Sequence, residues 1–358
     1  MPRDGDEPRA HRGRGAQTNP VNRFTELVVE LDPDEVEDDD LRVRTRYLDD
    51  TSRSVISRNT SPDLGFTASL NPYRGCEHGC SYCYARPTHE YLGLSAGLDF
   101  ERSMLVRRQA AARRDAEVSN PAWEPPPLML AGGTAPYQPV ERRMRITRAC
   151  LEVLARYRNP VGVITKNALV TRDVDVLKEL AGWGGVRVPL PTTTLDEALR
   201  PKLEPRTSTI ANRLGAIEKL AGAGVPVGVN VAPIVPGLTD AEAPRILQAA
   251  AAAGASHAGY TLLRLPGAVT PLFEEWLGQH APMRKQRVLN RIREVHAGRL
   301  DDRQFGRRMR GAGLYAEQVR SLFHKARERA GIPHRVPPLA RSEFRVPGRV
   351  VQGSLFEE

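Results

Sequence analysis

From residue 67 onward, short apolar runs alternate with longer segments in which apolar residues recur every three or four positions. The short runs predict β-strands, and the longer segments predict α-helices. The predicted strands are Thr67–Leu70, Leu128–Ala131, Val161–Thr165, Val186–Leu190, Val227–Ala232 and Gly259–Leu263, with a further strand near Met104–Val106. The predicted helices between them are Val140–Tyr157, Val174–Ala181, Ile210–Ala221 and Ala243–Ala253. Strands that alternate with helices of this length are typical of parallel βαβ units.

Six such units predict an α/β fold, a partial (β/α)6 barrel of the TIM type. In barrels of this type, the reactive groups lie on the loops that follow the carboxyl ends of the strands. The loop after the first predicted strand therefore occupies a position at which a barrel of this kind carries its active site.

The segments on either side of the barrel have other patterns. Residues 1–46 carry scattered arginines and glycines and then an acidic run, so we expect a disordered N-terminal tail. Residues 47–266 form the predicted core barrel. Residues 267–330 are predicted to be a C-terminal helical extension, and residues 331–358, rich in Pro and Arg, an extended tail. The helices predicted in the extension are Thr270–Leu277, Pro282–His296 and Ala316–Ala330.

Charge and hydropathy bear on the partners. Lys and Arg number 52 against 43 Asp and Glu, a balance that is compatible with a nucleic acid partner and equally with solvated Arg-rich helix faces. No apolar segment reaches the roughly 18 residues that a membrane span requires. Met1 leads into Arg3, Asp4, Asp6 and Glu7 with no apolar stretch, which does not fit a signal peptide. We therefore expect no membrane association and a cytoplasmic localisation.

Three of the four cysteines lie within eight residues, with the spacing C-x3-C-x2-C at Cys76, Cys80 and Cys83. A chain of this length needs no disulfides to hold its core, so the clustering points to metal binding. Thiolates are soft ligands that suit iron–sulfur clusters and zinc. A [4Fe–4S] cluster is normally held by four thiolates, so three leave one iron open, as a catalytic metal site requires.

A structural zinc site of the Cys3His type is the alternative, with His78 or His89 as its fourth ligand. Zinc knuckles usually show paired C-x2-C spacings, and only Cys80 and Cys83 form one here. A second hypothesis about function follows from this alternative: a nucleic-acid-binding protein with a structural iron–sulfur or zinc site. Its other support is the basic stripe Arg284, Arg287 and Arg291 on a predicted helix.

The motif C-x3-C-x-aromatic-C after the first strand of a (β/α) barrel resembles that of the radical S-adenosylmethionine (SAM) superfamily. More narrowly, the chain is similar to the spore-photoproduct-lyase-like branch over roughly residues 66–266. The segments that carry this similarity are Asn71–Cys76, Cys80–Arg86, Pro136–Glu141, Thr165–Lys166, Thr193–Glu197, Lys202–Arg206 and Val231–Asp240.

The resemblance implies a [4Fe–4S] cluster and S-adenosyl-L-methionine as cofactors. It implies that the open iron binds the cofactor's amino and carboxylate groups, and that the reduced cluster cleaves it to methionine and a 5′-deoxyadenosyl radical. An external electron donor of the flavodoxin or ferredoxin type would then be a partner. The resemblance does not identify the substrate, because proteins that share a fold act on different substrates.

The same resemblance assigns residues to the cofactor. It places Tyr82 near the adenine of the cofactor and Tyr84 beside the cluster. It places the amino group of the cofactor at residues 132–134, and the carboxylate or ribose of the cofactor at Lys166. Thr192 follows the fourth strand, where ribose hydroxyls would lie, or helps to cap the next helix. Asn230 is a polar residue inside an apolar strand and needs a partner. The expected cofactor residues are Tyr82, Tyr84, Gly132, Gly133, Thr134, Lys166, Thr192 and Asn230.

Two departures from the resemblance concern a DNA photoproduct lyase, which is an alternative function. Related sequences carry Asp before Pro-Tyr-Gln-Pro, whereas this chain has Ala135. The lyases also use a cysteine inside the active site, and Cys150 is the one remaining thiol. Cys150 shares a helical face with Ile146, Val153 and Tyr157, so we expect it to be a buried core residue outside the barrel.

Overall fold

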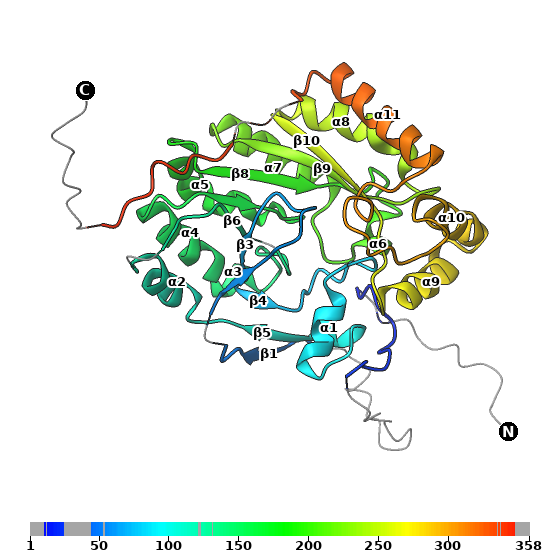
Figure 1. Cartoon of the computed structure of the whole chain (residues 1–358), viewed down its shortest axis with the longest axis horizontal. Coiled ribbons are helices and arrows are strands. Elements are labelled where there is room, and N and C mark those ends of the chain that lie inside the picture. Colours follow the sequence, from blue (N-terminus) through cyan, green and yellow to red (C-terminus); the bar gives the residue numbers. More distant parts are fainter. Residues whose placement is uncertain are drawn as a thin grey trace.

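A computed structural model describes residues 11, 13–24, 44–52, 54–120, 123–130, 132–334, 336 and 338–347. Its central element is a seven-stranded sheet with the order β10-β9-β8-β7-β6-β3-β2 (Figure 1). The strands are β2 (Ile56–Arg58), β3 (Ala68–Leu70), β6 (Leu128–Leu130), β7 (Val161–Val163), β8 (Val186–Pro191), β9 (Val227–Ile234) and β10 (His257–Leu262). Six of them are parallel, and β2 lies antiparallel to β3 at one edge.

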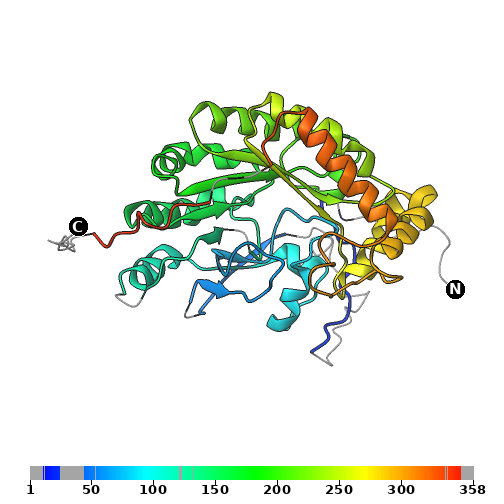
Figure 2. The same ribbon diagram turned by 45° about the horizontal axis from the view of Figure 1, so that its top comes forward.

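The six parallel strands are the six that the apolar runs predict, so the partial (β/α)6 barrel is confirmed. The two edge strands, β2 and β10, are not paired with each other within the described residues, so the sheet stays open. The sheet curves, and helices line its outer face (Figure 2). These helices are α4 (Ile146–Arg156), α5 (Val174–Ala181), α7 (Ile210–Gly222) and α8 (Ala243–Ala252).

The prediction of one continuous helix over residues 140–157 is wrong. The chain forms α3 (Glu141–Met144) and α4, separated by Arg145 with a left-handed φ of 53°. The Glu141 carboxylate accepts the backbone N–H of Thr147 at 3.1 Å, which satisfies a free donor at the start of α4. Apolar periodicity does not show such a break, because both pieces keep the same face toward the sheet.

A second, three-stranded sheet packs below the barrel, with the order β1-β5-β4. Its strands are β1 (Arg46–Asp49), β4 (Tyr73–Arg74) and β5 (Ser103–Val106). The strand predicted near Met104–Val106 therefore exists but does not belong to the barrel. Helix α1 (Leu98–Arg102) leads into β5, and α2 (Ala110–Val118) follows it.

The predicted C-terminal helices are confirmed as α9 (Val269–His280), α10 (Pro282–Val295) and α11 (Leu314–Arg329). Phe273 and Trp276 of α9 and Val288 of α10 belong to an apolar cluster that also contains Cys80 and Tyr82. The extension thus packs directly against the loop that carries the cysteines. Among the described residues, no helix is both long and apolar enough to cross a membrane.

The prediction of a disordered tail over residues 1–46 is wrong for residues 13–24, here called the N-terminal strap. The strap is dark blue in Figure 1 and lies beside α1 and α9. Its Thr18 accepts the backbone N–H of Leu98 at 3.2 Å and donates its hydroxyl to Glu275 at 3.0 Å. Residues 1–10, 12 and 25–43 lie outside the described residues.

The last described residues, 338–347, form neither helix nor strand and run over the outer helices. The backbone N–H of Arg345 donates to the carbonyl of Tyr157 at 3.0 Å, and that of Ala340 donates to Gly184 at 3.1 Å. The remainder of the predicted extended tail, residues 348–358, lies outside the described residues.

Candidate active site

The three clustered cysteines lie on the loop that directly follows β3, residues 71–86, here called the cysteine loop. Cys76 is anchored by its backbone N–H, which donates to the carbonyl of Phe100 at 2.9 Å. Gly75 and Gly79 have positive φ values of 82° and 64°, which L side chains rarely adopt. These two glycines let the loop turn tightly on both sides of Cys76.

The three thiols are free, and they are desolvated together. Cys76 and Cys80 are buried, and Cys83 is half-buried. Burial and the neighbouring Cys83 raise the pKa of the Cys76 thiol to about 12. Burial also raises the pKa of Cys80 well above its usual range, and Glu204, Cys83 and Cys76 add to this. A buried thiol with a raised pKa becomes a thiolate when a metal binds it, and thiolates are the usual ligands of iron–sulfur clusters.

The two histidines that could complete a zinc site are held by other groups. His78 Nε2 lies 3.4 Å from the amide nitrogen of Asn167, and His89 Nε2 lies 2.9 Å from the carbonyl oxygen of Ser103. Burial lowers the pKa of His78 to about 3, so the imidazole is neutral. In the described part of the chain, no three His, Cys, Asp or Glu side chains are placed to hold a single metal ion. The Cys3His arrangement is therefore not formed there.

A buried ion pair holds the middle of the cysteine loop. Arg86 is fully buried, and its Nε and Nη2 atoms donate to the carbonyl oxygen of Cys80 at 3.1 and 2.9 Å. The same guanidinium donates to the carbonyl of Gly97 at 2.9 Å and pairs with the buried carboxylate of Glu101. Charge-assisted bonds of this kind are the stronger class of hydrogen bond. The position of Cys80 is thereby tied to α1.

A second buried network joins the cysteine loop to the strand ends. The Tyr82 hydroxyl donates to Glu204, which follows the short helix α6 (Arg200–Leu203), and lies 3.1 Å from the Thr193 hydroxyl. Lys166, after β7, donates to Glu204 at 2.9 Å, to Thr193 at 3.2 Å and to the carbonyl of Ala232 at 3.0 Å. The structure therefore brings Tyr82 and Lys166 together, as expected if both residues contact the same cofactor.

Residues 132–134 follow β6 and lie against the cysteine loop. A Cβ atom at Gly132 would overlap the side chain of Ser69, so the chain can pass β3 only with a glycine there. The N–H of Gly133 donates to the side-chain oxygen of Asn71 at 2.9 Å, and the Thr134 hydroxyl donates to Tyr73 at 2.8 Å. Tyr84, whose side chain is largely exposed, donates its hydroxyl to the carbonyl of Gly132 at 3.3 Å.

Thr192 directly follows β8 and lies beside Asn230, which is in the middle of β9. The backbone N–H of Thr192 donates to the carbonyl of Asn230 at 2.8 Å. The Thr192 hydroxyl is buried and has no hydrogen-bond partner among the described residues. An unpaired buried hydroxyl costs about 1–3 kcal/mol, which a ligand hydroxyl or carboxylate would recover. This orphaned group fits a cofactor bound at the carboxyl edge of the sheet.

Cys150 lies in α4, fully buried in the main apolar core, as predicted. Burial raises the pKa of its thiol to about 12. Three residues that organise the site were not predicted, namely Arg86, Glu101 and Glu204. The one signal for Glu204 is its place in Lys202–Arg206, one of the segments that carry the resemblance.

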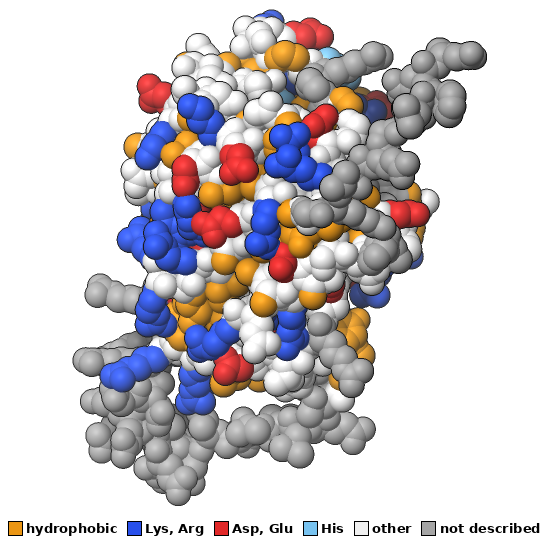
Figure 3. Space-filling model, turned by 90° about the vertical axis from the view of Figure 1, so that its left-hand side faces the viewer, with side chains coloured by type: hydrophobic (Ala, Val, Ile, Leu, Met, Phe, Trp, Pro, Cys, Tyr) orange, Lys and Arg blue, Asp and Glu red, His pale blue; other side chains and the backbone are white. Residues whose placement is uncertain are grey.

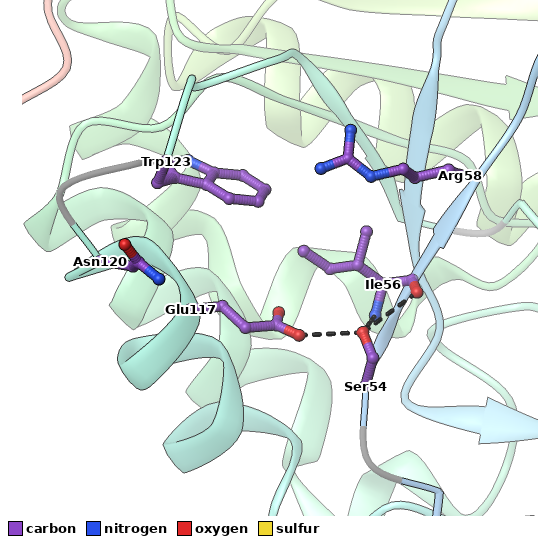
Figure 4. A pocket seen from close by; sticks show the side chains of 6 residues that line it. All are labelled: Ser54, Ile56, Arg58, Glu117, Asn120 and Trp123. Atoms are coloured by element: carbon purple, nitrogen blue, oxygen red, sulfur yellow. Dashed lines mark hydrogen bonds between the residues drawn. The ribbon is translucent and has the colours of Figure 1, made fainter.

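A cavity elsewhere lies between the edge strand β2 and the end of α2 (Figure 4). Its lining residues are Ser54, Ile56, Arg58, Glu117, Asn120 and Trp123. The Ser54 hydroxyl donates to Glu117 at 2.9 Å across it. Residues 121 and 122, between two of the lining residues, lie outside the described residues.

Comparisons with known proteins agree with this site. A family model of the radical SAM superfamily matches residues 70–250, half of the chain. An uncharacterized protein of Mycobacterium tuberculosis is 34% identical over 235 residues, which cover 65% of this chain and 68% of that protein. An uncharacterized protein of Methanocaldococcus jannaschii is 24% identical over 178 residues, covering 48% and 62%.

Among solved structures, spore photoproduct lyase complexed with a dinucleoside spore photoproduct is similar with a TM-score of 0.56. The match covers 80% of each chain at 18% sequence identity, so it shows a shared fold. The matched family model begins at the end of β3 and contains all three clustered cysteines. The chain therefore belongs to the radical SAM superfamily, whose enzymes use a [4Fe–4S] cluster and S-adenosylmethionine.

Proposed function

We propose that Cys76, Cys80 and Cys83 hold the [4Fe–4S] cluster of this radical SAM enzyme and leave one iron free for the cofactor. The observation that carries the proposal is the set of three free thiols, two buried and one half-buried, on one loop at the carboxyl end of the first parallel strand. When bound and reduced, the cluster supplies the electron that cleaves SAM into methionine and a 5′-deoxyadenosyl radical. An external donor of the flavodoxin or ferredoxin type supplies that electron.

The chain's own residues bind and orient the cofactor. The backbone at Gly132 and Gly133, with Thr134, offers polar groups to its amino end. Lys166 is assigned to its carboxylate, a role in which the ammonium group would exchange its pairing with Glu204 for the cofactor. The unpaired Thr192 hydroxyl and the Asn230 amide face its ribose. Tyr82 is buried beside the thiols and packs near the adenine, where it helps to exclude water.

The exposed ring of Tyr84 stands beside Gly132 and marks the open side of the site. There the radical would meet its substrate.

For the substrate we propose a nucleic acid. Two observations support this class: the basic excess of the chain, and the fold shared with a lyase that was solved with a dinucleoside photoproduct. Basic and acidic side chains are interspersed on the face in Figure 3, so charge alone does not mark where a strand would bind. The photoproduct lyase reaction itself is not favoured, because the fourth thiol, Cys150, is buried in the core.

Formation of 5′-deoxyadenosine tests the activity and its substrate class. We expect anaerobically reconstituted protein to form 5′-deoxyadenosine when dithionite and SAM are added. We expect single-stranded DNA or RNA to change the rate of this reaction at low salt, and to change it less at high salt. Chromatography of quenched reactions measures the product. A protein that binds iron but forms no 5′-deoxyadenosine would favour the hypothesis of a structural cluster. A rate of 5′-deoxyadenosine formation that neither DNA nor RNA changes would exclude nucleic acids as the substrate class.

A further inference from the structure

The N-terminal strap crosses the cysteine loop in direct backbone contact. A Cβ atom at Gly15 would overlap the carbonyl oxygen of Gly79 and lie 3.0 Å from the backbone nitrogen of Ser81. A Cβ atom at Gly79 would in turn lie 2.6 Å from the Glu101 carboxylate and 3.3 Å from the Gly15 nitrogen. Two glycines thus face each other, at a spot between the first and second cluster cysteines where neither chain can carry a side chain.

One carboxylate fixes the strap at this crossing. The backbone N–H groups of Gly15 and Ala16 donate to the two oxygens of Glu101, at 3.1 and 2.9 Å. The Arg14 guanidinium donates to the backbone carbonyl of Glu101 at 2.7 Å, and Arg206 donates to the carbonyl of Gly13 at 3.1 Å. Ala16 is 2% exposed. The crossing is therefore buried, and both strap amides donate to a carboxylate that is also paired with Arg86.

The same carboxylate connects the strap to a cluster ligand. Glu101 pairs with Arg86, and Arg86 holds the carbonyl of Cys80 through two hydrogen bonds. The strap amides, the ion pair and the cysteine loop thus form one continuous buried network. Opening the strap would remove two donors from Glu101 and uncover the backbone between Cys76 and Cys80.

We propose that the N-terminal strap is a cover for the cluster, held shut by Glu101, which limits the access of solvent and dioxygen to the cysteine loop. The proposal rests on the proposed function, since it assumes that the three cysteines hold the cluster. If oxidants reach the cluster only when the strap is open, the rate of cluster loss in air is proportional to the fraction of molecules with an open strap.

Gly15→Val tests the cover, because the new side chain collides with Gly79 while Glu101, Arg86 and the cysteines stay unchanged. Each lost hydrogen bond to a charged acceptor raises the open population roughly tenfold. We expect hydrogen–deuterium exchange of residues 13–24 and the decay of cluster absorbance in air to accelerate by the same factor, tenfold or more.

Two comparisons keep this test decisive. Gly65→Val is the matched control, since nothing lies within 4 Å of a Cβ atom there, and it should change neither rate. Ala16→Pro replaces the N–H that donates to Glu101 with a ring carbon, which removes this hydrogen bond and crowds the carboxylate, and it should accelerate both rates by an equal factor. Faster exchange with unchanged cluster decay would overturn the cover, and so would unchanged exchange. Failure of the wild-type chain to assemble any cluster would instead refute the proposed function.

Discussion

Replacing Cys80 with alanine is expected to abolish cluster assembly and all cleavage of SAM. Its thiol is buried, and its backbone carbonyl is held by Arg86, so the cysteine loop presents this thiol at a fixed point. The remaining pair, Cys76 and Cys83, would leave two irons without a protein ligand instead of one. Iron and sulfide analysis after anaerobic reconstitution, together with the visible absorbance, measures the loss.

Cys150→Ala is the matched control for this result. Cys150 is buried in α4, within the main apolar core, and is the fourth cysteine of the chain. Its replacement should leave the iron content and 5′-deoxyadenosine formation unchanged, with only a modest loss of stability from the small cavity. Full cluster content in the Cys80 variant, or its loss in the Cys150 variant, would contradict the assignment of ligands.

Glu204→Gln is expected to destabilise the folded protein by about 3–5 kcal/mol, the usual cost of breaking a buried ion pair by removing one partner. Glu204 is fully buried and bridges two cations, with Lys166 on one carboxylate oxygen and Arg213 on the other. The glutamine keeps the shape but leaves both cations without a counter-ion. Denaturant unfolding of the metal-free protein measures the change. The matched control is Glu294→Gln, which removes a half-exposed partner of Arg291 and should cost about 1 kcal/mol or less.

The same substitution has a signature in the pH dependence of stability. Burial opposes ionisation of Glu204, but Arg213 and Lys166 lower its pKa well below the ordinary range. A carboxyl whose folded-state pKa is lowered stabilises the fold above its unfolded pKa of about 4.3, and this stabilisation is lost as the pH falls further. The wild-type protein should therefore lose more stability between about pH 5 and 3 than Glu204→Gln does. Parallel curves would show that Glu204 is not held as a buried anion.

The parallel strands could be predicted from the sequence because they are mostly buried, so runs such as Val227–Ala232 are mainly apolar. The cysteine loop could be predicted because its chemistry lies within eight residues and follows the first of these runs. Local patterns of this kind need no knowledge of distant contacts.

The features that the sequence did not reveal depend on distant contacts. Edge strand β2 has a single apolar residue, Ile56, and is formed by its pairing with β3. Glu101 and Glu204 look like solvated charges until Arg86 and Arg213, each on another element, neutralise them. The N-terminal strap has the composition of a disordered tail, and it is ordered by the acceptor that Glu101 provides rather than by its own apolar residues.

The central claim is that the three clustered cysteines hold a [4Fe–4S] cluster with an iron that binds SAM. Electron paramagnetic resonance of the reduced, reconstituted protein tests it most directly, with spectra recorded before and after addition of SAM. We predict a [4Fe–4S] signal that changes when SAM is added, because the cofactor occupies the iron that no cysteine binds. A cluster signal that is identical with and without SAM would contradict the account.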